Sequence, residues 1–291
     1  MSIPKNHHHV SKCHIRYFKN NETGKYYLYN KELDIFEKPK PSEESIFSED
    51  YVNTRFKDGE LDHKGLEDEL NIKFETDFVQ HADKVIEAVS NSTYEIDSLK
   101  ASLQYLLRYA VISDMRHPSF KKDADDRVND LMSNALNHIF YLETGEKSDY
   151  KISDFEKSKT KYSNLLDYND IAQERLQSMG NLSIDVVVAG DNDEFILPDT
   201  GCYLKRARIN NYINKNIQEI AVIGLPLTYK IFILATSVKL QGVKEGVFVV
   251  KNIPSLLVED ANRELYINGI KKVLAHNKNV LEFIVEKYKS N

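Results

Sequence analysis

One aspartate stands at the end of the clearest predicted strand pair in this sequence. The stretch IDVVVAGDNDEFILPD, which ends at Asp199, opens with a β-branched run over Ile184–Ala189 that is typical of a strand buried on both faces. A tight turn follows, and Glu194–Leu197 is predicted to return as a second strand, which Pro198 ends because it has no amide hydrogen to donate. At a strand end, a lone carboxylate can orient or deprotonate a water molecule. The alternative is that Asp199 caps the turn at Thr200-Gly201.

Histidines gather at the start of the chain. The stretch NHHHVSKCHIRYF (Asn6–Phe18) holds four of them within eight residues, and His7 and His9 would share one face of a strand, where they could bind a metal. A surface histidine cluster is the other explanation. Cys13 and Cys202 have no partners at metal-ligand spacing, and the turn before Asp199 accounts for its acidic residues (Asp191, Asp193 and Glu194). We therefore expect no bound metal and no cofactor.

Cationic and aromatic side chains supply a second signal. The run Lys205-Arg206-Ala207-Arg208 follows soon after Asp199, and Arg116 precedes His117, Lys121 and Lys122, so each group could contribute to a phosphate-binding rim. Several tyrosines could stack on an extruded base: Tyr17, Tyr26, Tyr27, Tyr29 and Tyr203. Solvated surface and ordinary packing are the alternatives. Because the net charge is −6, a polyanion would have to meet a local basic patch.

The composition indicates an ordinary globular protein. The chain has 291 residues, of which 41% are hydrophobic, which is enough for a sizeable core. The N-terminal MSIPKNHHHVSK lacks the apolar core of a signal peptide, and no run approaches the ~18 apolar residues of a membrane span. Two cysteines form no disulfide framework. We expect a soluble, cytoplasmic protein that does not enter a membrane.

Helices and strands alternate in blocks along the chain. Ile15–Phe18 and Lys25–Tyr29 are predicted to form an N-terminal hairpin, and hydrophobic periodicity then predicts helices over Leu61–Val89, Leu99–Met115, Asp123–Leu142 and Ile152–Met179. The second half has predicted strands at Ile217–Ile223, Lys230–Thr236 and, as an edge strand, Val247–Lys251, followed by helices at Ser255–Ile267 and Lys271–Lys289. This order predicts a single α+β domain over residues 1–291. Its mixed β-sheet would be formed by the N-terminal hairpin and the C-terminal strands, with a large helical insertion over residues 61–180.

Several of these motifs resemble a large bacterial family known only as domain of unknown function 4238. HHHVSKCHIRYF is similar to its His-His-Tyr-Val-Pro-Gln-Phe-Tyr-Leu-Arg-Asn-Phe start, and Leu99–Pro118 resembles a central helix that ends in Arg-x-Pro, here Arg116-His117-Pro118. FILPDTG resembles its Phe-Ile-Thr-Ser-Asp-Asn-Pro motif, and LPLTYKIFIL resembles its Pro-Leu-Ser-Pro stretch. The resemblance covers nearly the whole chain in the same order.

The resemblance implies a set of marked positions, which are His7, His8, Arg16, Arg116, Asp199 and Asn262. The chain departs from the family pattern at Ser11, where the family has Pro, and on both sides of Asp199, where Leu197-Pro198 and Thr200-Gly201 replace Thr-Ser and Asn-Pro.

From these residues we expect a hydrolase that acts on nucleic acid, on DNA rather than RNA. The preferred reaction is metal-independent cleavage of an N-glycosidic bond, as in a DNA glycosylase, because one aspartate can stabilise an oxocarbenium-like sugar while it orients water. The expected catalytic residues are Asp199, His8 and His7, and the expected substrate-binding residues are Arg16, Arg116, Lys205, Arg206, Arg208 and Asn262. The resemblance to a family scattered among bacteria implies a role in defence against phage. The alternatives are a metal-dependent nuclease and a non-catalytic binding or regulatory protein.

Overall fold

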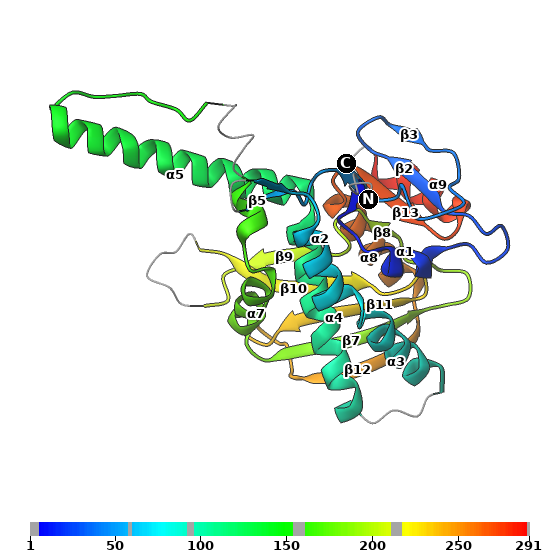
Figure 1. Cartoon of the computed structure of the whole chain (residues 1–291). Coiled ribbons are helices and arrows are strands. Elements are labelled where there is room, and N and C mark those ends of the chain that lie inside the picture. The colour runs from blue at the N-terminus through cyan, green and yellow to red at the C-terminus, as the bar shows by residue number, and fades with distance from the viewer. Residues whose placement is uncertain (1–5, 58–59, 92–95, 154–160, 211–216, 290–291) are drawn as a thin grey trace.

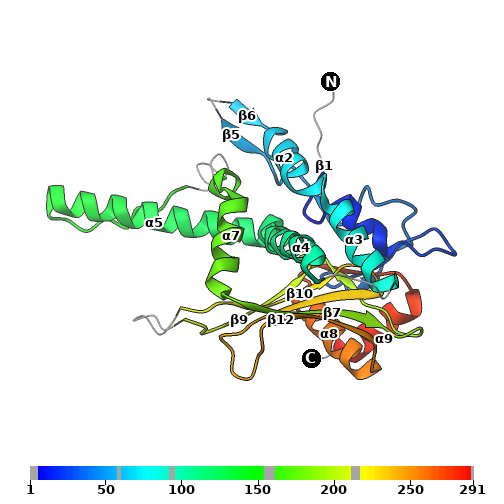
Figure 2. The same cartoon turned by 90° about the horizontal axis from the view of Figure 1, so that it is seen from below.

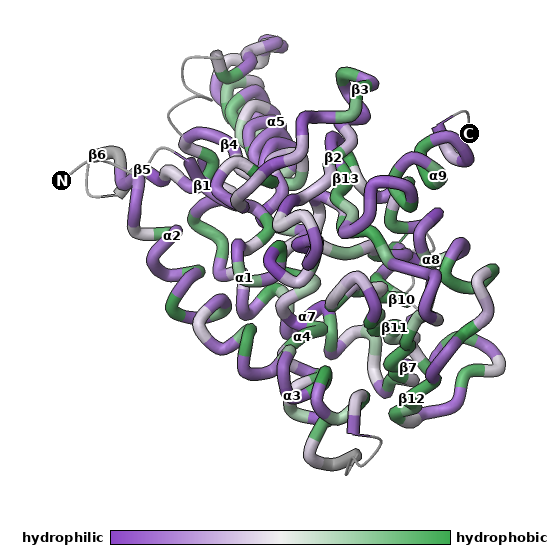
Figure 3. The backbone as a smooth tube through the Cα atoms, turned by 90° about the vertical axis from the view of Figure 1, so that its right-hand side faces the viewer, coloured by the Kyte–Doolittle hydropathy of each residue, from purple (hydrophilic) through white to green (hydrophobic). Residues whose placement is uncertain are grey.

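A five-stranded mixed sheet forms the centre of the molecule. The computed structural model describes residues 6–57, 60–91, 96–153, 161–210 and 217–289. The strand order is β12-β7-β11-β10-β9, and every neighbouring pair is antiparallel except β12, which runs parallel to β7. These strands are β7 (Leu182–Ala189), β9 (Tyr203–Ala207), β10 (Glu219–Pro226), β11 (Ile231–Ser237) and β12 (Gly246–Ile253). The predicted edge strand at Val247–Lys251 is therefore confirmed. Figure 3 shows the hydrophobic segments of β7, β10, β11 and β12, of which Phe248 and Val250 on the edge strand β12 remain exposed.

A second, four-stranded sheet joins the two ends of the chain. Its order is β3-β2-β13-β8, and all pairs are antiparallel. The strands are β2 (Tyr27–Asn30), β3 (Ile35–Phe36), β8 (Leu197–Pro198) and β13 (Lys272–Ala275). The α+β class is thus confirmed, with strands from both ends of the chain in one sheet.

Three local predictions in this region are wrong. Residues 15–18 are not a strand, because α1 (Lys12–Ile15) and the 3₁₀ turn η1 (Arg16–Phe18) bury Ile15 and Phe18 instead. The segment Glu194–Leu197 does not form a hairpin with β7, because β11 and β12 already occupy both edges of β7. Leu197 and Pro198 pair with β13 at the sheet edge, where proline is tolerated. Residues 272–275 form β13, so the last predicted helix begins later, at α9 (Lys278–Tyr288).

Helices cover both faces of the five-stranded sheet, as Figures 1 and 2 show. The buried helix α4 (Ile96–Arg116) crosses one face together with α3 (Phe78–Asn91) and α7 (Tyr168–Met179), and α8 (Ser255–Asn268) and α9 lie on the other. The predicted helix over Leu61–Val89 is interrupted, because a π turn, η2 (Asn71–Glu75), separates α2 (Gly65–Leu70) from α3. Part of the predicted helix over Ile152–Met179 lies outside the described residues, and its described part is the 3₁₀ turn η3 (Tyr162–Leu165) followed by α7.

Two small strand pairs and one long helix complete the fold. β1 (Asn6–His8) pairs with β4 (Ser48–Asp50), and β5 (Arg55–Lys57) pairs with β6 (Glu60–Asp62). Helix α5 (Pro118–Thr144) begins against α4 and then extends away from the body of the molecule (Figures 1 and 2). Among the described residues, no helix is both long and apolar enough to cross a bilayer.

Candidate functional site

Three segments that are distant in sequence meet at the junction of α4 and α5. Pro118 at the first position of α5 holds His117 in an extended conformation (φ −61°, ψ 137°), so α4 ends there and His117 becomes the N-cap of α5. His9 follows β1, and Asp199 follows β8. The turn after Asp199 needs the left-handed backbone of Gly201 (φ 77°), and a Cβ there would lie 2.9 Å from Ser113 Cβ of α4. This close approach places Asp199 against the end of α4.

The Asp199 carboxylate is buried and held by backbone amides. Its Oδ1 accepts a hydrogen bond from the amide of Ile270 at 2.8 Å, and its Oδ2 accepts from those of Lys271 and Lys272 at 2.8 and 3.0 Å. Burial opposes ionisation, but contact with His117, the nearby His9 and the amide bonds outweigh it and hold the pKa of Asp199 below its ordinary value. The capping alternative is wrong, because the carboxylate binds amides from another part of the chain and not those of its own turn.

Two buried imidazoles stand next to this carboxylate. His117 Nε2 lies 3.5 Å from Asp199 Oδ2, and the rings of His9 and His117 meet edge to face at 5.0 Å. Burial first, and then the neighbouring His117, hold the pKa of His9 well below its ordinary value, so His9 is neutral. His9 Nδ1 and His117 Nε2 have no hydrogen-bond partner among the described residues. Asp199, His117 and His9 therefore form a compact acid–base cluster.

This cluster has the donor set of a metal site, yet one contact indicates that the His117 nitrogen facing Asp199 carries a proton. One possible ligand atom from each of the three residues lies within 4.8 Å of the others, and two imidazoles with a carboxylate suit zinc. However, His117 Nδ1 accepts the amide hydrogen of Ser119 at 3.2 Å. A neutral imidazole that accepts at Nδ1 carries its proton on Nε2, which here faces Asp199. A metal on Nε2 would require this proton to move and the helix cap to break.

The predicted histidines and Arg116 lie beside the cluster in a second polar network. Arg116 is fully buried, and its guanidinium donates to Glu75 Oε1 and to the carbonyl oxygen of His8, both at 2.6 Å. His8 Nε2 contacts the carbonyl oxygen of Glu43 at 3.2 Å, and His7 Nδ1 accepts the amide hydrogen of Asn53 at 2.9 Å. Arg116 of α4 is therefore hydrogen-bonded to the end of β1, at His8. The N-terminal histidine that lies next to Asp199 is His9.

A buried lysine extends this network. Lys121 Nζ donates to Asn164 Oδ1 at 2.8 Å and to Asn53 Oδ1, and burial together with the nearby Arg116 holds the pKa of Lys121 well below its ordinary value. Lys121 is thus enclosed by protein groups and is not part of a solvated basic rim.

Three other predicted binding residues, Arg16, Lys205 and Asn262, have partners other than Asp199. Arg16 is exposed and pairs with Glu43 at 2.7 Å, and Lys205 on β9 pairs with Glu264 of α8 at 2.8 Å. Arg206 lies on β9 and Arg208 directly after it. Asn262 of α8 accepts the amide hydrogen of Ile196 and donates to the carbonyl oxygen of Glu194, so it braces the segment that leads to Asp199. The structure thus brings Arg116 and Asn262 near the site in supporting positions.

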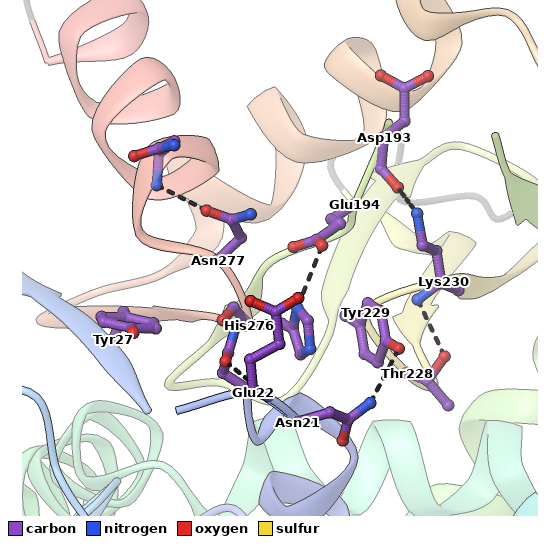
Figure 4. A network of polar contacts seen from close by, with 12 residues as sticks. Asn21, Glu22, Tyr27, Asp193, Glu194, Thr228, Tyr229, Lys230, His276 and Asn277 are labelled. Atoms are coloured by element: carbon purple, nitrogen blue, oxygen red, sulfur yellow. Dashed lines mark hydrogen bonds and ion pairs between the residues drawn. The ribbon is translucent and has the colours of Figure 1, made fainter. Parts of the chain in front are cut away.

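The acidic residues before Asp199 belong to a different contact group (Figure 4). Glu194 Oε1 lies 3.1 Å from Nδ1 of His276. His276 directly follows β13, whereas the amides that hold Asp199 lie at the start of this strand. The ring of Tyr229 stacks on His276 at 3.8 Å, and Lys230 Nζ donates to the carbonyl oxygen of Asp193 at 2.7 Å. These contacts tie the segment before β8 to β11 and β13, and they add no carboxylate to the Asp199 cluster.

Sequence reasoning identified Asp199 but missed its two partners. His117 was noticed only as a neighbour of Arg116, although its place directly before Pro118 is a helix-capping signal. His9 was considered only as a surface metal ligand paired with His7.

Comparison with known proteins gives a family without a named activity. No curated protein and no solved structure matches the chain. A family described as "Protein of unknown function (DUF4238)" matches residues 6–279, which is nearly the whole length. The expected resemblance is therefore confirmed, and the chain belongs to the DUF4238 family.

Proposed function

We propose that this chain is a hydrolase that acts on nucleic acid, with Asp199 orienting the attacking water. The observation that carries the proposal is the buried pair of an ionised Asp199 and a His117 whose proton is directed at it across 3.5 Å. Hydrolysis needs one group that activates water and another that assists the leaving group, and this pair supplies a carboxylate and an N–H donor side by side.

The single carboxylate favours cleavage of an N-glycosidic bond. Within the described residues, the cluster around His117 holds one carboxylate, whereas two-metal phosphodiester cleavage needs several. An ionised aspartate can stabilise an oxocarbenium-like sugar, guide water to it and take the proton of that water, and the Nε2–H of His117 can donate a hydrogen bond to the departing base, which leaves with the proton that the water gives up.

A cavity under α8, on the face of the five-stranded sheet opposite α4, offers aromatic rings that can stack on a base. It has a volume of about 590 Å³, and its lining includes Phe195, Tyr203 and Lys205. Three carboxylates, Asp185, Asp260 and Glu264, share this lining, and Glu264 already pairs with Lys205. Stacking on the rings, and not attraction for a phosphate, is therefore what favours a nucleic-acid substrate. DNA is the preferred substrate, and defence against phage is the expected role.

Two other functions have an observation in their favour. The exposed fractions of Asp199 and His117 are only 1% each, so a binding or regulatory protein in which this network holds the fold is the first alternative. The second is a metal-dependent nuclease, favoured by the three donor atoms within 4.8 Å.

The test compares the wild type with His117→Asn on cellular and phage DNA. Asparagine keeps an oxygen that can cap α5 but removes the imidazole, and the control is His138→Asn, an exposed position of the same helix. We expect the wild type and the control to release free base and to give strand breaks only after alkali treatment, with activity surviving excess chelator. His117→Asn should lose this activity and keep its melting temperature within a few degrees.

The other outcomes separate the alternatives. Direct breaks that chelator abolishes would indicate the nuclease. If no DNA or RNA is cleaved by the wild type, the enzyme proposal is abandoned in favour of the binding protein.

A further inference from the structure

The long helix α5 leaves an apolar stripe uncovered. Its first turns are packed against the body, where Lys121, Asn129 and Ser133 are buried. On another side of the helix, five large apolar side chains are exposed to between 41% and 69% of their surface, namely Leu131, Met132, Leu136, Ile139 and Leu142; Phe140 and Tyr141 are exposed outside this stripe. A helix with such a stripe gains most of its stability by burying it, so this stripe calls for a partner.

The stripe has the spacing of a helix–helix contact. Val128, Met132, Ala135, Ile139 and Leu142 follow one another at alternating intervals of four and three residues. This is the repeat by which one helix packs along another, with side chains of each helix entering the gaps of its neighbour. Leu131 and Leu136 flank this line and widen it. The partner that fits is therefore another helix with a similar apolar stripe.

The opposite side of α5 is already occupied by the chain itself. After α5 ends at Gly145, the chain runs back along the helix, where Asn137 and the backbone of Tyr150 exchange two hydrogen bonds at 2.9 and 3.0 Å. The amide of Ile152 donates to Ser133 Oγ at 3.2 Å. These contacts keep α5 extended and direct its uncovered stripe outward.

We propose that α5 pairs with α5 of a second copy of this chain, stripe against stripe, to form a symmetric dimer. The occupant is a second copy because the stripe provides the matching helix and because its area is sufficient. The five large side chains expose on the order of 500 Å² per copy, so a pair would bury about 1,000 Å², the lower bound for a specific interface, before any flanking contacts are counted. The far half of α5 extends away from the rest of the molecule, so a second α5 can approach its stripe (Figures 1 and 2).

The α5 dimer does not depend on the proposed hydrolase activity. The proposed reaction centre lies at the first residue before α5, and the stripe lies on its far half. If the protein is a dimer without hydrolase activity, only the proposed function fails. If it is an active monomer, only the proposed dimer fails.

The experiment measures the mass of the full chain in solution by light scattering and sedimentation across concentrations of about 1–100 µM. We expect the wild type to be a dimer. Leu136→Glu places a charge half-way along the stripe, beside its central line, and should weaken dimerisation at least about 30-fold, as expected for a residue that the interface buries. The control Asn134→Glu adds the same charge at an exposed position of α5 outside the stripe, so it should leave the dimer unchanged.

Three results would overturn the proposal. They are a wild type that is monomeric at 100 µM, a Leu136→Glu dimer as tight as that of the wild type, or equal weakening by Asn134→Glu. Because Leu136 is 46% exposed, its substitution should leave the far-ultraviolet circular dichroism unchanged, which excludes unfolding as the cause of dissociation.

Discussion

Replacement of Asp199 by asparagine should destabilise the fold, although aspartate and asparagine have nearly the same shape. The carboxylate accepts three amide hydrogens, one on Oδ1 and two on Oδ2. An asparagine has one oxygen, so its best orientation keeps the bonds from Lys271 and Lys272 and turns its NH₂ group toward the amide of Ile270. One charge-assisted bond is lost, and two donors then face each other.

The expected loss is about 3 kcal/mol. A bond to a charged acceptor contributes roughly 1.5–3 kcal/mol, and an unsatisfied, partly buried donor adds roughly 1 kcal/mol or more. For a domain of this size, each kcal/mol lowers the melting temperature by roughly 2–4 °C, so Asp199→Asn should melt roughly 6–12 °C below the wild type. Loss of activity in this variant would therefore not by itself identify Asp199 as catalytic.

Urea denaturation at several pH values checks both the size and the cause of the effect. The pKa of Asp199 is lower in the folded chain than in the unfolded one. The stabilisation is therefore complete above the unfolded pKa of about 3.9 and is lost as the pH falls through the folded pKa. The difference between the two proteins should stay constant from pH 7 to 5 and shrink below about pH 4. The control is Asp191→Asn, which lies exposed in the preceding turn. A shift of less than 2 °C for Asp199→Asn, or an equal shift for the control, would refute the reasoning.

Three further predictions follow from the surroundings of the site. Gly201→Ala should lower the melting temperature more than Gly24→Ala does, because both glycines have positive φ but only Gly201 would bring a Cβ against Ser113. Equal decreases in melting temperature would contradict this. Burial lowers the pKa of His14 to about 4, so stability should be complete above pH 6.5 and fall by about 1.4 kcal/mol per pH unit between 6.5 and 4. In urea titrations at pH 7 and 5, His14→Gln should reduce the difference in unfolding free energy between the two pH values. An unchanged difference would exclude His14 as its source. Arg116→Lys should cost about 3 kcal/mol or more, because a lysine cannot make both buried contacts of the guanidinium; a chemical denaturation midpoint equal to that of the wild type would refute this.

Much of the secondary structure was determined by local sequence. The β-branched run at Ile184–Ala189 is a central strand, and the apolar Leu99–Met115 is the buried helix, because side-chain periodicity depends on near neighbours alone. The end of α4 at Arg116 follows from Pro118, which excludes the helical conformation from the preceding residue.

Strand pairing was decided by the tertiary structure. Residues 194–197 had the composition of a returning strand, yet both edges of β7 were taken by β11 and β12, which come later in the chain. Ile15 and Phe18 were read as strand residues, but they are buried from a helical turn. Local propensity cannot distinguish these outcomes, because the competing partners are distant in sequence.

In the candidate site, too, local sequence predicted one part and tertiary packing decided the rest. Asp199 was identified from the sequence because a turn and a family-like motif mark it. His9 and His117 were not assigned to it, because nothing in their own segments indicates which carboxylate they will meet. Their approach depends on the packing of β1, the α4–α5 junction and β8 together, and the apolar stripe of α5 is known to be uncovered only because the fold carries it away from the core. Sequence determined the groups that can do chemistry, and tertiary packing determined which of them stand together.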